Sequence, residues 1–319
     1  MTPTLRYLSE ADVVAASPAT AETIDLAATA LRALADGTAQ LPPKHRLHHR
    51  TDPPAHSYAM PAYSPVGDLL GLKWVTSAHG NAEHDLPVVN GTVTLVDADT
   101  GLCRCVMGAR WLTGLRTAAV SGACLALAPP EPGVVALLGT GLQAHTHLAV
   151  LDTVGLHDVR VWGRRAESVD RLVEWAGEHV PAVRLRPAAT IPEALDGAGV
   201  VITGVTQGVE TARIDDAWLR PDALLLPLDY GTCVQGALAD GRTLAADDPA
   251  QFVAVRDAGG STLDGYRDPD AASGALLGRL RPDGAIIVQN IGNGVCDLFI
   301  AEAVLRRAEA LGRGHELPL

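Results

Sequence analysis

The sequence predicts an α/β fold built on a doubly wound parallel sheet, and three neighbouring patterns indicate it. An apolar run at 134–138 ends in Gly139-Thr-Gly-x-x-Ala144, a helical pattern follows at 142–154, and a second strand pattern comes at 159–162. In a dinucleotide-binding unit the first glycine makes the turn from strand to helix, and the second lets the backbone approach a pyrophosphate. Because strand and helix patterns then alternate to about residue 288, we expect a Rossmann-type domain.

Length and composition limit the class of protein. The chain has 319 residues, enough for two domains, and its hydrophobic residues make up 47%. No apolar run reaches the roughly 18 residues of a membrane span, and no basic and apolar leader pattern is found at the N-terminus. Five cysteines in no framework spacing indicate reduced thiols, and a net charge of -12 argues against nucleic acid. We therefore expect a cytoplasmic enzyme with neither membrane nor nucleic-acid partners.

The first part of the chain has patterns of a smaller α+β domain. Ser17 as N-cap, Pro18 at the first helical position and Gly37 after the end predict a helix. Between 41 and 106 the patterns are short and strand-like, and 72–76 and 91–96 are expected to be strands of a mostly antiparallel sheet. An alanine-rich helix is predicted over 115–127, before a pair of prolines.

The remaining elements define the predicted domains. Apolar runs predict parallel strands at 134–138, 159–162, 200–203, 224–228 and 285–288. Helical patterns lie at 142–154, 166–179, 192–195 and 297–311, the last of them amphipathic, and 262–273 is expected to be a surface loop. We predict that 119–296 form the dinucleotide domain, inserted into a smaller domain made of 1–118 and 297–319.

Two arginines bear on the cofactor. The end of the second strand of a dinucleotide fold carries an acid when NAD is bound and an arginine when the phosphate of NADP is bound. Here Gly163-Arg164-Arg165 follows that strand, and no acid stands there. NADP(H) is therefore favoured, with NAD(H) possible, and the alternative is a solvated basic turn before the next helix.

Three further charged residues have two interpretations each. Lys73 lies in an apolar segment, either as an edge charge that reaches water or as a buried partner of a ligand carboxylate. Arg116 is expected to open the helix at 115–127, where the macrodipole disfavours a cation; an anionic substrate group or an interdomain salt bridge would explain it. Asp229 ends the strand pattern at 224–228, as a ligand residue or as the start of a turn before Gly231.

A group of histidines and a pair of cysteines could suggest a metal site and a disulfide, but their spacing supports neither. The histidines at 45, 48, 49 and 56 have no cysteine or acid at zinc-like spacing, so we expect no metal. Cys103 and Cys105 are two apart on a strand and cannot form an ordinary disulfide, so we expect thiols.

Several segments together resemble the ornithine cyclodeaminase/mu-crystallin family. They are Met60-Pro-Ala-Tyr63, Gly71-Leu-Lys73-Trp-Val-Thr-x-x-x-Gly-Asn81, Leu115-Arg116-Thr-Ala-Ala119, Gly139-Thr-Gly141-Leu-Gln143-Ala144 and Ile291-Gly292-x-x-x-x-Asp297. Their order and spacing extend over most of the chain.

The resemblance implies a dinucleotide domain inserted into a domain that binds substrate and forms a homodimer. It implies α-amino or α-imino acid ligands whose carboxylate is bound by Lys73, Arg116 and a third cation, either Lys44 or Arg46. Asp229 and Lys73 are the residues expected to be catalytic. The expected cofactor contacts are Gly139, Thr140, Gly141, Leu142, Gln143, Gly163, Arg164, Arg165, Thr203, Ile291 and Gly292.

Two departures bear on the reaction. Ornithine cyclodeaminases carry a glutamate where this chain has Tyr58, and the turn at Arg164 and Arg165 looks more like that of the NADPH-using ketimine reductase mu-crystallin. We therefore expect an NADPH-dependent reductase of a cyclic imine or α-imino acid. The alternatives are an amino-acid cyclodeaminase that recycles bound NAD(P), an amino-acid or opine-type dehydrogenase, and a ligand-binding protein without turnover.

Overall fold

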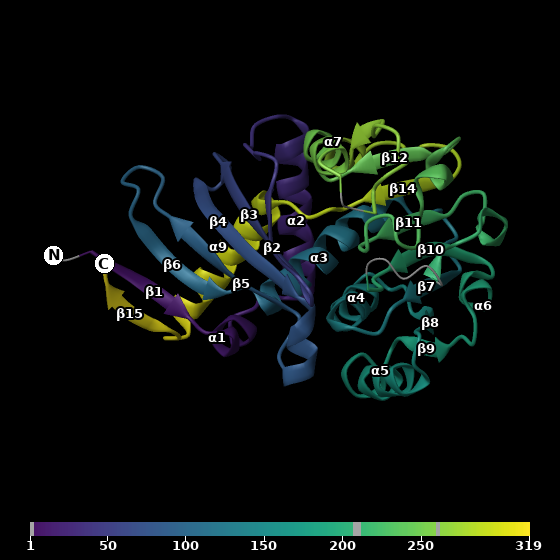
Figure 1. Ribbon diagram of the computed structural model, residues 1–319, viewed down its shortest axis with the longest axis horizontal. Helices are drawn as coiled ribbons and strands as arrows, with labels where there is room; N and C mark the ends of the chain where they lie inside the picture. The colour runs from purple at the N-terminus through teal and green to yellow at the C-terminus, as the bar shows by residue number, and fades with distance from the viewer. Residues whose placement is uncertain (1–2, 207–211, 260–261) are drawn as a thin grey trace. The chain divides into compact units, whose positions relative to one another are not determined.

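The structure is a computed structural model that describes residues 3–206, 212–259 and 262–319, and it divides the chain into two compact units. Unit 1 comprises Met1–Arg116 and Asn293–Leu319, and unit 2 comprises Thr117–Gly292. The division of the chain therefore falls at 116/117 and 292/293, whereas the boundaries expected from the sequence are 118/119 and 296/297. In Figure 1 the purple N-terminal segments and the yellow helix α9 belong to the same unit.

Unit 1 is built on one sheet in the order β15-β1-β6-β5-β4-β3-β2. The strands are β15 (His315–Pro318), β1 (Thr4–Leu8), β6 (Cys103–Gly108), β5 (Val89–Val96), β4 (Leu69–Ala78), β3 (Pro54–Ser64) and β2 (His45–Thr51). Neighbours run antiparallel except β1 and β6, which are parallel. Burial alternates along β5 and β6 because successive side chains point to opposite faces. The predicted antiparallel sheet is confirmed.

Among the helices of unit 1, the start of α2 differs from the sequence prediction. The helices are α1 (Glu10–Ala15), α2 (Thr20–Ala35), the 3-10 helix η1 (His79–His84) and α9 (Gly294–Ala310). Ser17 is not the N-cap expected for α2, which begins at Thr20 after Ala19 and has no side-chain cap. The Ser17 hydroxyl instead donates to the Val13 carbonyl of α1 and accepts from the Trp111 indole. This serine therefore serves the preceding helix, a long-range use that the local pattern does not reveal.

Helix α9 lies directly on the sheet and also contacts α1 and α2. A Cβ on Gly294 would come within 2.9 Å of the Met60 carbonyl oxygen, and one on Gly71 within 2.7 Å of the Leu298 side chain. These two glycines let helix and sheet approach closely. The expected amphipathic helix from 297 is therefore wrong in two respects. It begins at Gly294 after the Asn293 cap, and it is buried around much of its circumference because structure covers both sides.

Unit 2 is a parallel sheet in the order β13-β12-β14-β11-β10-β7-β8-β9. The strands are β13 (Ala271–Ala272), β12 (Thr243–Ala246), β14 (Ile286–Gln289), β11 (Leu224–Pro227), β10 (Ala198–Thr203), β7 (Val134–Leu138), β8 (Asp158–Trp162) and β9 (Arg184–Pro187). The helices are α3 (Arg110–Cys124), which begins in unit 1, α4 (Leu142–Thr153), α5 (Ala166–His179), α6 (Ile191–Leu195), α7 (Pro249–Asp257) and α8 (Ser273–Leu276), with 3-10 turns η2 (Leu125–Leu127), η4 (Asp216–Trp218) and η5 (Gly236–Ala239). The predicted α/β class with a doubly wound sheet is confirmed.

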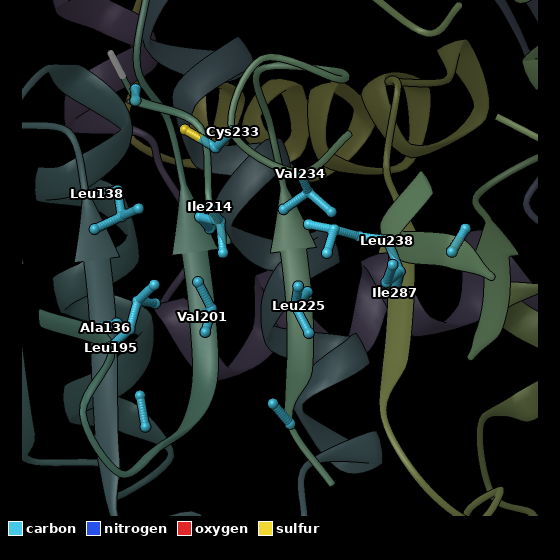
Figure 2. Packing of buried hydrophobic residues seen from close by; sticks show 14 of the residues in the cluster. Ala136, Leu138, Leu195, Val201, Ile214, Leu225, Cys233, Val234, Leu238 and Ile287 are labelled. Atoms are coloured by element: carbon cyan, nitrogen blue, oxygen red, sulfur yellow. The ribbon is translucent and has the colours of Figure 1, made fainter. Parts of the chain in front are cut away.

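The core of unit 2 explains the continuous apolar runs of the sequence. Leu138, Val201, Leu225 and Ile287 lie on four neighbouring strands and are almost completely buried (Figure 2). Every residue of β10, β11 and β14 is buried. Strands of a parallel sheet are covered on both faces, so they carry apolar side chains at successive positions instead of alternating ones.

The strand order of unit 2 determines where a ligand can bind. From β7 the chain adds β8 and β9 on one side of the sheet and then returns to add β10 and β11 on the other. The direction of winding therefore reverses between β7 and β10. In open α/β sheets ligands bind beyond the carboxyl ends of the strands at this switch point.

None of the helices within the described ranges combines the length and apolar character that a bilayer crossing requires.

Candidate functional site

The predicted glycine turn lies at the switch point of unit 2. Gly139 follows β7 with φ of +120°, and a Cβ there would come within 2.5 Å of the Gly204 carbonyl oxygen, which follows β10. Gly141 is the N-cap of α4, and a Cβ there would meet no described atom within 4 Å. Gly139 is thus required by the fold, whereas Gly141 leaves open space before the free amides of a helix N-terminus. That is the arrangement that receives a pyrophosphate.

A cleft of about 500 Å³ surrounds this turn. The predicted cofactor residues that line it are Gly139, Thr140, Gly141, Gly163, Arg164 and Arg165. The predicted residues outside its lining are Leu142, Gln143, Thr203, Ile291 and Gly292. After β10 the cleft is lined by Gly204, Val205 and Thr206, which directly follow the predicted Thr203.

One end of the cleft is strongly basic. Arg164 and Arg165 are exposed between β8 and α5, and Arg171 lies on α5 with its Nη2 3.1 Å from the Ser168 hydroxyl. Sequence reasoning missed Ser168 and Arg171. Ser168 comes three residues after Arg165, and Arg171 comes three residues after Ser168, which is a helical spacing, so a search along the face of α5 would have found them. The end of the cleft therefore presents three guanidinium groups and a hydroxyl.

In unit 1 the two predicted clamp cations share one buried carboxylate. Lys73 Nζ lies 2.7 Å from Asp297 Oδ2, and Arg116 Nε lies 3.0 Å from Asp297 Oδ1. The side chains of Lys73 and Asp297 have no exposed surface. Burial, with the Arg116 charge, lowers the pKa of Lys73, and the Asp297 carboxylate opposes that change. The edge-charge interpretation of Lys73 is therefore wrong.

The placement of Arg116 corrects another prediction. Helix α3 begins at Arg110, so Arg116 lies within it and does not open it. The Glu10 carboxylate accepts hydrogen bonds from the N–H groups of Arg110 and Trp111, at 2.7 and 3.1 Å. The helix start is thus stabilised by a residue about a hundred positions away, which a local pattern cannot show. The Arg116 ion pair lies within unit 1 and is not the interdomain bridge considered above.

Sequence reasoning quoted Asp297 as the end of a family motif but did not identify it as the partner of Lys73 and Arg116. Asp297 lies in the apolar run Val295–Ile300 near the start of α9 and is fully buried. A buried carboxylate is rarely found without a partner, so an acid inside such a run indicates cations elsewhere in the fold. That signal was present in the sequence.

The third cation of the predicted clamp stays open between two residues. Lys44 Nζ lies 5.1 Å and the Arg46 guanidinium 5.8 Å from the centroid of the Tyr58 ring. Lys44 is buried and close enough to Lys73 to contribute to lowering its pKa. Both candidates therefore lie on the same aromatic side chain, at distances typical of cation–π contacts.

Asp229 of unit 2 follows β11 and is 1% exposed. Its carboxylate accepts from the N–H groups of Val205, at 3.2 Å, and Cys233, at 3.3 Å. Burial raises the pKa of Asp229, although the side chains of Cys233 and Thr203 act in the opposite direction. Figure 2 shows Cys233 at the arrowhead end of the strands. Asp229 thus joins the segments after β10 and β11, and its role toward a ligand stays a prediction.

The histidines of β2 and β3 form no metal cluster in the described part of the chain, where no group of three or more His, Cys, Asp or Glu could hold an ion. His48 and His56 have ring centroids 6.3 Å apart. Burial, with the charges of Arg46 and His48, lowers the pKa of His56 to about 4. The cysteines at 103 and 105 are free thiols.

Comparisons with known proteins identify the family. The model of the ornithine cyclodeaminase/mu-crystallin family matches residues 6–237. The chain belongs to this family. It is 31% identical to the nodulation efficiency protein NfeD of Rhizobium meliloti, over 97% of each chain. It is 30% identical to the ketimine reductase mu-crystallin of Mus musculus, over 77% of this chain and 78% of that protein.

A solved structure shares the fold of the whole chain. An archaeal alanine dehydrogenase dimer with bound NAD superposes with a TM-score of 0.85 at 22% identity, over 99% of this chain and 100% of that one. The family resemblance inferred from the sequence motifs is confirmed by the family match over residues 6–237.

The two glycines of the cleft should respond differently to alanine. We expect Gly139→Ala to lower the thermal midpoint, because of its positive φ and its contact with Gly204. Gly141→Ala should leave the midpoint unchanged and weaken NADPH binding roughly 10- to 100-fold, since a lost charge-assisted hydrogen bond costs roughly 1.5–3 kcal/mol. Calorimetry measures both. Unaltered NADPH affinity in Gly141→Ala would argue against a phosphate site here.

The buried ion group predicts a large stability effect at Asp297. Asp297→Asn should lower the free energy of unfolding by about 3–5 kcal/mol, because it leaves Lys73 and Arg116 buried without their carboxylate. Glu302→Gln on the same helix is the control; its partners Arg104 and Arg306 are partly exposed, so a loss of about 1 kcal/mol is expected. Urea unfolding gives both values, and equal losses would contradict the prediction.

Proposed function

We propose that this chain is an NADPH-dependent reductase of a cyclic imine or α-imino acid. The observation that carries the proposal is the cleft at the switch point of unit 2, with its glycine turn and its three arginines. Family membership and the similarity to a ketimine reductase support the reaction class. In this proposal 119–296 bind the dinucleotide, and 1–118 with 297–319 bind substrate and form the homodimer.

The residues of the cleft fit NADPH. Gly141 leaves room where a larger side chain would obstruct the pyrophosphate, and the N-terminus of α4 supplies amide donors. Arg164, Arg165 and Arg171 offer the donors that the 2′-phosphate requires. The contacts proposed for Leu142, Gln143, Thr203, Ile291 and Gly292 rest on the family alone.

The residues of unit 1 fit a substrate carboxylate. Lys73, Arg116 and either Lys44 or Arg46 bring three positive charges together, while Asp297 supplies one negative charge. The group therefore keeps an excess of positive charge for one carboxylate. Fixing that carboxylate restricts the α-carbon to one orientation and lowers the entropic cost of the reaction.

The proposed proton donor is Asp229. NADPH, when bound, supplies the hydride that adds to the imine carbon. The imine nitrogen then needs a proton. Burial raises the pKa of Asp229, which favours the protonated carboxyl group that can supply it directly or through water.

The second candidate is a cyclodeaminase, which the family also contains by name. It would oxidise an amino acid, lose ammonia on ring closure and reduce the imine with the same hydride, so absorbance at 340 nm would show no net change. A reductase consumes NADPH stoichiometrically. Tyr58 disfavours a substrate with a distal ammonium because a phenol does not pair with it as a carboxylate does. Net oxidation of NADPH with cyclic imines, without ammonia release from ornithine or lysine, decides for the reductase.

We further propose that the protein acts in the cytoplasm as a homodimer. Five free cysteines favour a reducing compartment. The dimer is supported by the archaeal alanine dehydrogenase, whose structure is described as one.

Cofactor preference should depend on the arginine turn. In the double variant Arg164→Gln, Arg165→Gln we expect the KM for NADPH to rise roughly 10- to 100-fold, from the loss of charged hydrogen bonds. Kinetics with NADH should change less than about twofold. Arg186→Gln is the matched control, because its ion pair with Asp158 lies at the start of β8, the end of that strand opposite to the arginine turn. A wild-type enzyme that prefers NADH would refute NADP specificity.

Turnover should depend on Asp229 and on pH. Asp229→Asn should lower kcat by roughly 10²- to 10⁴-fold, because the amide group of asparagine cannot transfer the required proton. The Kd for NADPH should stay within a few-fold of the wild-type value. The exposed Asp222→Asn is the control. Since the pKa of Asp229 is raised, wild-type kcat should fall as pH rises through a value above that of an ordinary aspartate. Near-normal kcat in Asp229→Asn would remove this role.

A further inference from the structure

The sheet of unit 1 places a row of side chains next to the proposed carboxylate clamp. Lys73 of β4 is paired in register with Met60 of β3, and two residues along the same strands Val75 is paired with Tyr58. On its other side Tyr58 is paired with Arg46 of β2. Side chains two apart lie on the same face of a strand, so Arg46 and Tyr58 share the face of Lys73.

The next row continues the same face. His56 is paired with Ser77 on one side and with His48 on the other. Burial changes along β3: Met60 is 3% exposed, whereas Tyr58 and His56 are only half-buried. The face therefore leads from the buried clamp at Lys73 toward solvent past Tyr58 and His56.

This face is positively charged in an acidic protein. The segment 44–78 contains two acids, Asp52 and Asp68, and both lie in turns outside the strands. Since the pKa of His56 is lowered to about 4, that imidazole is neutral near pH 7. The permanent charges beside Tyr58 are therefore those of Lys44 and Arg46.

The separation of Lys44 and Arg46 sets the length of a ligand that could reach both. Lys44 Nζ lies 5.1 Å and the Arg46 guanidinium 5.8 Å from the centroid of the Tyr58 ring, so the two cations are at most about 11 Å apart. Two carboxylates separated by roughly two or three methylene groups, each paired with one cation, fit within this distance, and a guanidinium binds a carboxylate through two parallel hydrogen bonds. A ligand with an ammonium group at its far end would instead bring that positive charge next to Arg46.

We propose that the substrate carries a second carboxylate at the end of its side chain, and that Arg46 beside Tyr58 binds it. The substrate class is thus the imine of a 2-oxo dicarboxylic acid. The inference rests on the proposed reductase function and specifies its substrate. It assigns Lys44 to the α-carboxylate and Arg46 to the distal one.

The kinetic test compares two imines that differ at the far end. 2-Oxoglutarate and 2-oxohexanoate, whose side chain is uncharged, are each supplied with ammonium, and NADPH oxidation is followed at 340 nm. We expect kcat/KM to be at least about tenfold higher for the diacid, and Arg46→Gln to remove that preference by lowering kcat/KM for the diacid to about the value for 2-oxohexanoate. Arg50→Gln is the matched control. It lies on the same strand, but a register shift pairs it with Ala55 and so with the opposite face.

A binding measurement separates the two proposals. Isothermal titration with L-glutamate and L-norleucine, in the presence of NADP⁺, should show tighter binding of glutamate to the wild type and to Arg50→Gln but not to Arg46→Gln. If no imine is reduced and this preference is found, the reductase function is wrong and the dicarboxylate site stands. Equal rates and equal affinities for the diacid and for the ligand with an uncharged side chain would overturn the dicarboxylate site alone.

Discussion

The buried carboxylate of Asp297 is the constraint on which unit 1 depends. Removing three charged groups from water costs several kcal/mol for each ion, and their mutual attraction offsets that cost only in good geometry. The geometry comes from α9: Gly294 and Gly71 let the helix approach the sheet until Asp297 reaches Lys73. Hydrophobic residues at the positions of Lys73, Arg116 and Asp297 would avoid this desolvation cost. The retained charges therefore indicate use, and an excess of positive charge beside a single carboxylate suits an anionic ligand.

Unit 2 reaches its site by a different physical route. Its strands are buried on both faces, so the sheet offers ligands only the ends of its strands. The reversal between β7 and β10 separates the loops there, and Gly139 fits only because it has no Cβ to meet Gly204. The same edge carries Asp229, which is held by main-chain donors. A rigid parallel core thus fixes the polar groups at its edge.

Sequence alone predicted the elements whose signal is local. Five strands of unit 2, β7, β8, β10, β11 and β14, and the bounds of α5 follow from apolar runs and helical periodicity, and the glycine turn follows from its spacing. The short strands β9, β12 and β13 were not predicted. Features that depend on distant residues were missed or misplaced. The start of α3 is set by Glu10, and the edge pairing of β15 with β1 joins the two ends of the chain. Lys73 could be singled out as unusual, but its partner lies 224 residues away. No periodicity within either segment encodes that pairing.

Burial shifts the two central titratable groups toward their neutral forms, with opposite consequences for the proposed reaction. A neutral Asp229 is the form that can donate a proton, so the raised pKa of Asp229 assists it. A neutral Lys73 binds a carboxylate poorly, so the lowered pKa of Lys73 opposes substrate binding. Asp297 counteracts that loss, and an arriving carboxylate does so again. If a ligand binds the protonated Lys73 more tightly than the neutral one, then the bound ligand raises the proton affinity of Lys73 by the same factor. Binding of an acidic substrate and proton uptake by Lys73 are therefore coupled. Both requirements favour the protonated state, so the proposed reduction of an imine gains on the acidic side of the pH range in which the fold is stable.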